Sequence, residues 1–297
     1  MKKAQLWITG IVGAAAVAGG GIAVMQSQPD TADVIDSVTA PGEESVPADE
    51  APLAESPTAP DTPTTPQRPD PKLSDFPHKR LELTDEVSEG SEFDQFRDRL
   101  QKAIQDRDTE FVRSILPADG LTYGFGGPLR VDDMDLNQED GWFWQELEKM
   151  MALESCETSE YPPVEAGGTV WVCPNTTQAF YRQYPAPADA EGIEHEFSKV
   201  MVMGQNVNVR AAPNTDSPVV GILSNELVEF DQAAATRQYE ANPDARPGAI
   251  KGWTPVILPN DVQGYVYNRY AYAPLDPRGL FENVNGQWQL IRVLAGD

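Results

Sequence analysis

The stretch NVNVRAAPNTDSPVVGIL, residues 206–223, decides the fold of the C-terminal half of the chain. Val207 and Val209 alternate with polar residues, which is the period of a half-buried β-strand. Pro and Asn then mark a turn, and a second apolar run follows from Val219 to Leu223. Two short strands joined by a turn are expected here, and they indicate a small all-β unit.

Further short motifs follow this stretch in a fixed order. They are Val207-Asn208-Val209-Arg210, Val219-Val220-Gly221, Gly252-Trp253-Thr254-Pro255-Val256 and Gly264-Tyr265-Val266. In this order they resemble the bacterial SH3 (SH3b) domain over about residues 199–272, and together with the chain around them they resemble exported SH3b-containing proteins of unknown function. One departure is a polar, Pro-containing stretch of about twenty residues between Phe230 and Gly252, where the family has a short turn.

The resemblance implies binding and no chemistry. It implies an SH3-like small barrel at residues 199–274 whose ligand is a cell-wall (peptidoglycan) peptide or an envelope protein. Aromatic side chains are the expected contact residues, because flat rings bury a large area at low entropic cost. The candidates are Trp253, Tyr265, Tyr267, Tyr270 and Tyr272, of which about half are expected to be structural.

Residues 91–198 have the pattern of a separate α+β domain. Phe93, Phe96, Leu100 and Ile104 recur at helical spacing, and a second helix follows with Asp108 as its cap. Another amphipathic helix is expected within QEDGWFWQELEKMMALE, residues 138–154, and a strand from Thr169 to Cys173. The expected fold class is therefore α+β: a domain of helices and antiparallel strands, plus the all-β SH3-like small barrel.

The tail, residues 275–297, predicts a hairpin with Asn285-Gly286 as a type I′ turn. Its last strand is apolar on both faces, at Leu290, Ile291, Val293 and Leu294, so a cover on both sides is expected. We expect the hairpin to complete the α+β domain, with the barrel inserted in it. Two helices followed by late strands weakly resemble nuclear-transport-factor-like folds.

The N-terminal region predicts export. Residues 4–25 carry no charge after Lys2 and Lys3, and as a helix they would be long enough for a bilayer core. Ala16-Val17-Ala18 also matches a cleavage site, so a cleaved signal peptide and a retained inner-membrane anchor, at residues 1–25, are both open. The Pro-rich, acidic residues 26–90 are expected to be a disordered linker. A periplasmic or extracellular location follows.

Charge and cysteine content support the same location. The net charge of −25 argues against nucleic acid and anionic membrane surfaces as partners, because both select basic patches. The two cysteines, Cys156 and Cys173, predict one disulfide in an exported protein. Two thiols without a neighbouring pair of histidines are too few for structural zinc.

The sequence shows little basis for catalysis. The two histidines, His78 and His195, stand in no metal-binding motif, and the chain has no Gly-x-Ser-x-Gly nucleophile motif. No catalytic residue, metal or cofactor is predicted, and the protein is expected not to be an enzyme. The alternative is a small-molecule pocket or weak hydrolase in the α+β domain, which a pocket lined by Trp142, Trp144 and Trp288 with a buried carboxylate would favour.

Overall fold

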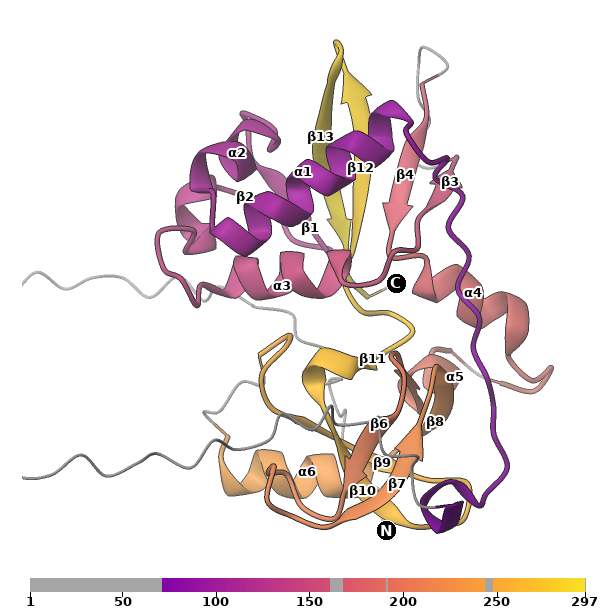
Figure 1. Cartoon of the computed structure of the whole chain (residues 1–297). Helices are drawn as coiled ribbons and strands as arrows, with labels where there is room; N and C mark the ends of the chain where they lie inside the picture. The colour runs from indigo at the N-terminus through magenta and orange to yellow at the C-terminus, as the bar shows by residue number, and fades with distance from the viewer. Residues whose placement is uncertain (1–70, 161–167, 191, 244–247, 297) are drawn as a thin grey trace, which may run out of the picture. The chain divides into compact units, whose positions relative to one another are not determined.

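The computed structural model describes residues 71–160, 168–190, 192–243 and 248–296 (Figure 1). The expected leader at residues 4–25 and the expected linker up to residue 70 lie outside these residues. In the part that is described, no helix has the length and apolar character needed to cross a membrane. The described residues fall in one compact unit, in which helices accompany two β-sheets, so the α+β class is confirmed.

The first sheet has six strands in the order β2-β1-β13-β12-β4-β3. Neighbouring strands are antiparallel, except that β1 runs parallel to β13. The strands are β1 (Leu121–Tyr123), β2 (Pro128–Leu129), β3 (Glu157–Ser159), β4 (Val170–Cys173), β12 (Arg278–Val284) and β13 (Gln287–Leu294). Because β12 and β13 occupy the centre of this sheet, the residues between β4 and β12 form an insertion in it.

The C-terminal hairpin is confirmed. Val284 pairs with Gln287, and the two residues between them, Asn285 and Gly286, have φ values of 53° and 85°. Two consecutive positive φ angles define the type I′ turn that the Asn-Gly sequence predicts. Its strands place Leu290 and Val293 in the main core, whereas Ile291 and Leu294 lie half-buried against a smaller cluster on the sheet.

Three helices accompany this sheet: α1 (Glu92–Asp106), α2 (Thr109–Ser114) and α3 (Trp142–Met151). The hydroxyl of Ser91 accepts a hydrogen bond from the Asp94 N–H, which caps α1, and Asp108 accepts one from the Phe111 N–H, which caps α2. Arg107 joins the two helices in the left-handed conformation, with φ of 54°. The predicted helix pair, the Asp108 cap and the third helix are confirmed. A 3₁₀ turn, η2 (Val131–Met134), precedes α3.

The core of this half lies between the helices and one face of the six-stranded sheet, with α1 crossing the β12–β13 hairpin in Figure 1. Phe93 of α1 stacks on Trp171 with ring centroids 5.1 Å apart, and it meets the edge of Trp288 at 4.8 Å. Such ring pairs contribute about 0.5–1.5 kcal/mol beyond the area that they bury. The apolar stripe of α1 therefore fixes this helix on the sheet.

The second sheet has seven antiparallel strands in the order β11-β5-β8-β9-β10-β6-β7. They are β5 (Lys199–Val202), β6 (Val207–Arg210), β7 (Val219–Leu223), β8 (Glu226–Phe230), β9 (Trp253–Ile257), β10 (Gln263–Tyr267) and β11 (Ala271–Tyr272). The 3₁₀ turn η3 (Asn268–Tyr270) joins β10 to β11. The stretch 206–223 forms the hairpin β6–β7, as its alternation predicts, with Val207, Val209 and Leu223 in the core.

Two glycines allow this second sheet to pack closely. A Cβ atom on Gly264 would lie 2.5 Å from Val209 Cγ1, and one on Gly221 would lie 2.5 Å from Leu258 Cδ1. Real Cβ atoms do not approach other carbons so closely, so a larger residue at either position would force the neighbouring Val209 or Leu258 side chain to move. The glycines of the Val-Val-Gly and Gly-Tyr-Val motifs thus have a packing role.

Helices α4 (Thr176–Gln183) and α5 (Glu194–Phe197) follow β4. Phe180 of α4 is fully buried in a cluster with Met201 of β5, Leu227 of β8 and Leu81. This cluster is separate from the one that contains Val207 and Val209. The β5–β8 part of the second sheet is therefore covered by α4 and by a segment from the N-terminal side of the chain.

That segment, residues 71–90, is named here the N-terminal strap, and it corrects the last part of the linker predicted for residues 26–90, whereas residues 26–70 lie outside the described residues. It begins with a 3₁₀ turn, η1 (Pro71–Ser74), and buries Phe76, Leu81 and Val87 in three different clusters. The Leu81 N–H donates to the Asn225 carbonyl at 2.8 Å. Widely spaced apolar residues in a polar run have no helical or strand period, which is why the sequence indicated a linker.

Candidate functional site

The predicted contact residues of β9 and β10 lie side by side. Trp253 is opposite Tyr267 in the strand register, and their rings meet in a T-shaped contact with centroids 5.5 Å apart. Tyr265 precedes Tyr267 by two residues on the same face of β10 and lies opposite Pro255. All three aromatic side chains are half-buried, whereas Val266 between the two tyrosines is fully buried. We call Trp253, Tyr265, Tyr267 and Arg210 the outer face.

The other two candidates do not belong to the β9–β10 pair. Tyr270 lies in η3, is 41% exposed, and packs against Gly204. Tyr272 is only 2% exposed, and its hydroxyl donates to the Lys149 carbonyl at 3.2 Å. Tyr272 as a surface contact residue was therefore wrong, because the pairing of β11 with β5 turns its ring into the core of the molecule.

Arg210 joins the outer face from the neighbouring strand. It lies opposite Tyr265 in the β6–β10 register and is half-buried. Its Nη1 donates a hydrogen bond of 2.7 Å to the Ser217 carbonyl, in the turn between β6 and β7. The outer face thus combines three aromatic rings with a guanidinium group.

The insertion after Phe230 forms a helix beside β9. Helix α6 (Gln232–Ala241) begins at Asp231, whose side chain accepts from the Ala234 N–H at 2.8 Å. The Asp231 N–H donates to the Pro255 carbonyl, so the start of α6 is fixed to the strand that carries Trp253. Ala234 is buried and Tyr239 is 54% exposed. The stretch that departs from the family pattern therefore contains a helix, whose start is attached to β9.

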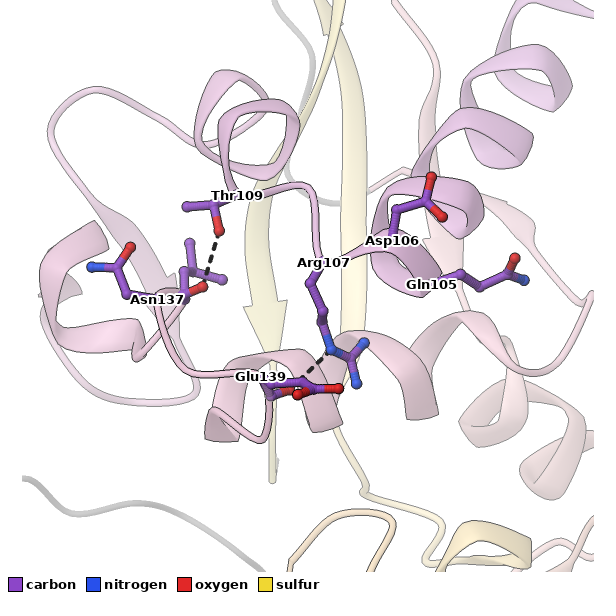
Figure 2. A pocket seen from close by; sticks show the side chains of 7 residues that line it. Gln105, Asp106, Arg107, Thr109, Asn137 and Glu139 are labelled. Carbon is purple, nitrogen blue, oxygen red and sulfur yellow. Dashed lines mark hydrogen bonds between the residues drawn. The ribbon is translucent and has the colours of Figure 1, made fainter. Parts of the chain in front are cut away.

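A hollow of about 490 Å³ lies elsewhere, at the junction of α1, α2 and the segment before α3 (Figure 2). It is lined by Gln105, Asp106, Arg107, Thr109, Leu136, Asn137 and Glu139. Arg107 is already committed within the protein: its Nε donates to the Glu139 carbonyl at 3.0 Å, its side chain pairs with Glu148, and it lies over the Trp144 ring. Arg107 therefore has few donors left for a ligand in the hollow.

The alternative pocket of Trp142, Trp144 and Trp288 is not formed. Trp144 is fully buried and donates to the Leu136 carbonyl, whereas Trp288 packs against Phe93. Trp142 makes a T-shaped contact with Tyr123.

A carboxyl group does lie near Tyr123, however. Burial raises the pKa of Glu146 to about 7. Lys149 lowers this pKa, the Asp276 carboxylate raises it, and the nearby Tyr123 hydroxyl lowers it. A carboxyl group that titrates near neutral pH is the kind of group that acid–base catalysis uses, but other structural clusters shift pKa values as well.

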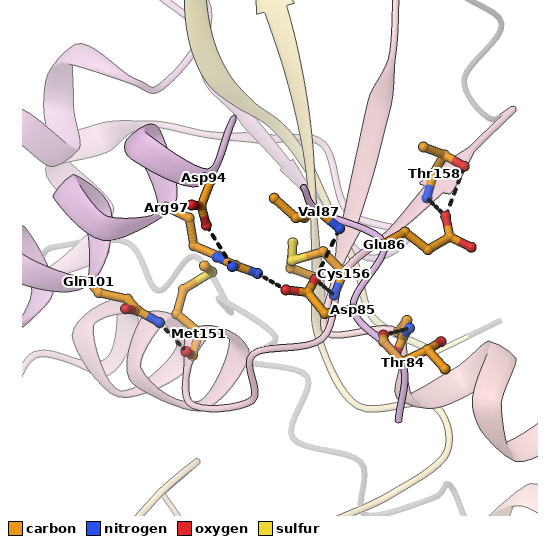
Figure 3. The surroundings of a disulfide bond; sticks show 12 residues. Thr84, Asp85, Glu86, Val87, Asp94, Arg97, Gln101, Met151, Cys156 and Thr158 are labelled. Atoms are coloured by element: carbon orange, nitrogen blue, oxygen red, sulfur yellow. Dashed lines mark hydrogen bonds and ion pairs between the residues drawn. A yellow bond between two sulfur atoms is a disulfide. The ribbon is translucent and has the colours of Figure 1, made fainter. Parts of the chain in front are cut away.

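The predicted disulfide is confirmed: Cys156 is bonded to Cys173, and both are fully buried (Figure 3). Beside it, Asp85 of the strap accepts a hydrogen bond from the Cys156 N–H at 3.1 Å, and Arg97 of α1 pairs with Asp85 at 2.6 Å. The bond therefore joins β4 to the segment before β3 and lies next to the contact of the strap with α1. A buried disulfide indicates an oxidising environment, in agreement with export.

No group of three His, Cys, Asp or Glu side chains suited to a metal ion occurs among the residues that the structure describes. Comparisons with protein-family models, with curated proteins and with solved structures found no match to this chain. The assignment of function therefore depends on the geometry of the outer face.

Two features of these sites had no clear signal in the sequence. Arg210 is part of the Val-Asn-Val-Arg motif, but only the β6–β10 register places it beside Tyr265. Glu146 is one acid among many in an acidic chain, and only the approach of Tyr123 and Asp276 distinguishes it.

Proposed function

We propose that this is an exported, non-enzymatic cell-envelope protein in which residues 199–274 form an SH3-like binding module. The support is positional: the four motifs of the resemblance fall on β6, β7, β9 and β10 of one antiparallel sheet. Two motif glycines, Gly221 and Gly264, occupy positions where a Cβ atom would clash. The disulfide agrees with a location in the cell envelope.

The ligand site of this module is the outer face, and its ligand is a peptidoglycan peptide. The contact of Trp253 with Tyr267 is the observation that carries this proposal. Paired rings that stay half-exposed on adjacent strands present a rigid, mostly apolar platform, which suits a peptide backbone or side chain. Nucleic acid is not the expected ligand, because it requires an extended basic patch and this chain has a net charge of −25.

The test is co-sedimentation of the full chain, kept soluble with a mild detergent, with purified peptidoglycan. Trp253→Ala and Tyr267→Ala should each reduce the pelleted fraction. If each ring contributes about 1–2 kcal/mol to binding, the apparent Kd should rise about tenfold in each variant. Phe125→Ala is the matched control, because Phe125 is 85% exposed and lies outside the outer face.

Circular dichroism spectra should show that all three variants are folded. Wild-type protein that stays in the supernatant would reject the wall ligand. Equal binding by the wild type and the Trp253 and Tyr267 variants would place the wall contact outside the outer face. An envelope protein would then be sought as the partner in place of the wall.

A second candidate function is a weakly hydrolytic or small-molecule site in the α+β half, with the SH3-like module as a targeting element. The observation in its favour is the Glu146 carboxyl group beside Tyr123, with a pKa of about 7. Incubation of the protein with peptidoglycan should release soluble fragments if this function is real. Loss of that release in Glu146→Gln would assign it to this carboxyl group, and no release by the wild type would eliminate it.

A further inference from the structure

Arg210 is a half-buried arginine that forms no ion pair with a carboxylate of the described residues. The chain carries 47 acidic against 22 basic residues, and many of its basic side chains in the folded part are paired, as Lys149 is with Asp276 and Arg269 with Glu148. Within the described ranges, Arg210 has no carboxylate partner. Its hydrogen bond to the Ser217 carbonyl uses one donor of the guanidinium group.

The nearest acidic residue along the turn is Asp216, directly before Ser217. Asp216 is exposed, its backbone N–H donates to the side chain of Asn214, and its carboxylate forms no ion pair with Arg210. Arg210 is therefore held in place by a neutral carbonyl group, and no carboxylate of the described residues pairs with its charge.

The setting is also partly desolvated. Arg210 is half-buried and lies opposite Tyr265 of β10. Tyr267 is two residues further along β10 and is paired with Trp253 of β9. An arginine presents five N–H donors in a planar fork, which matches the two oxygens of a carboxylate. Such charge-assisted pairs are about twice as strong as neutral hydrogen bonds, and a neighbouring aromatic surface strengthens them by excluding water.

We infer that the ligand of the outer face carries a free carboxylate, which binds to Arg210 while an adjoining apolar part of the ligand lies on Trp253 and Tyr267. This inference rests on the proposed function and narrows the ligand to the carboxylate-bearing peptides of the wall. Arg210 is then the residue that determines specificity, and the aromatic rings supply the contact area.

The experiment compares two preparations of the same purified peptidoglycan in the sedimentation assay. One is untreated, and in the other the carboxylates have been converted to amides with a carbodiimide and ammonia. General electrostatics predicts that a protein of net charge −25 binds the amidated wall better, because repulsion is reduced. The inference predicts the opposite sign: the apparent Kd of the wild type should rise about tenfold on amidation.

Variants provide the second readout. Arg210→Gln should bind the untreated wall about tenfold more weakly than the wild type and should lose nothing more on amidation. Arg99→Gln, which removes an exposed arginine from α1, is the matched control for the loss of one positive charge. Asp216→Asn should retain binding, since its carboxylate has no part in the site.

The outcomes separate the two proposals. If the wild type binds the amidated wall as well as or better than the untreated wall, the carboxylate inference is wrong, while loss of binding in Trp253→Ala would still support the outer face. If the wild type binds neither preparation, both proposals fail. If Arg210→Gln does not fold, because the Ser217 contact is lost, the comparison of the two walls with the wild type still decides the question.

Discussion

The carboxyl group of Glu146 should make the stability of the protein depend on pH near neutrality. Its pKa in the folded state is about 7, against an ordinary value of 4.5, chiefly because burial disfavours the charged form. The charged and titratable groups that face it are Tyr123 of β1, Lys149 of α3 and Asp276 after β11. Glu146→Gln keeps the size of the side chain and removes its titration.

The sign follows from the two pKa values. Between pH 4.5 and 7 the folded protein retains a proton that the unfolded chain has released, so the free energy of unfolding falls as the pH rises through this range. At 1.36 kcal/mol for each pH unit, the difference between 4.5 and about 7 corresponds to a loss of at most about 3 kcal/mol. The full loss is reached only above the pKa of the folded state.

The measurement is thermal unfolding of the wild type and Glu146→Gln between pH 5 and 8. The variant should gain stability relative to the wild type by about 2–3 kcal/mol over this interval, or roughly 4–12 °C in Tm for a folded unit of this size. Glu110→Gln, which changes an exposed side chain in the first turn of α2, should follow the wild type at every pH. Parallel Tm curves for the wild type and Glu146→Gln would refute the reasoning.

Three further predictions concern stability. Replacing Cys156 and Cys173 together by serine should lower the free energy of unfolding by about 3 kcal/mol in denaturant titrations, and wild type treated with a reducing agent should behave in the same way. Gly264→Ala should cost about 1–3 kcal/mol, whereas Gly127→Ala, with no atom within 4 Å of the new methyl group, should leave Tm unchanged; equal effects would contradict the packing role. Leu81→Ala should cost about 2–5 kcal/mol in thermal unfolding, and a neutral result would mean that the strap is not part of the fold.

The sequence predicted well those elements whose signals are local. The capping of α2 by Asp108 and the Asn285-Gly286 turn each depend on a few adjacent residues with specific backbone preferences. The hairpin β6–β7 follows from the alternation in β6 and the apolar run after the turn, and the disulfide follows from the presence of two cysteines in a chain whose N-terminal region predicts export. Such features need no knowledge of distant partners.

The features that sequence analysis missed depend on distant contacts. Leu81 is an isolated apolar residue in a polar segment, and its burial depends on the Asn225 carbonyl before β8, which accepts its N–H, and on Phe180 of α4. The burial of Tyr272 also depends on a distant contact, since the pairing of β11 with β5 decides which way its ring points. Hydrophobic periodicity and secondary-structure propensity carry no information about the burial of Leu81 or of Tyr272.

The short motifs of the second sheet contain residues whose packing contacts depend on one another. Gly264 and Val209 constrain each other, because the space for the valine methyl group exists only where the glycine lacks a side chain. Residues in such contacts cannot vary freely, whereas α6, attached mainly through Asp231 and Ala234, leaves most of its surface unconstrained. A sheet that retains its packing glycines can therefore accept a helical insertion beside β9. The start of this insertion is hydrogen-bonded to Pro255, two residues along β9 from Trp253, so a change at Asp231 would act on the strand that carries Trp253.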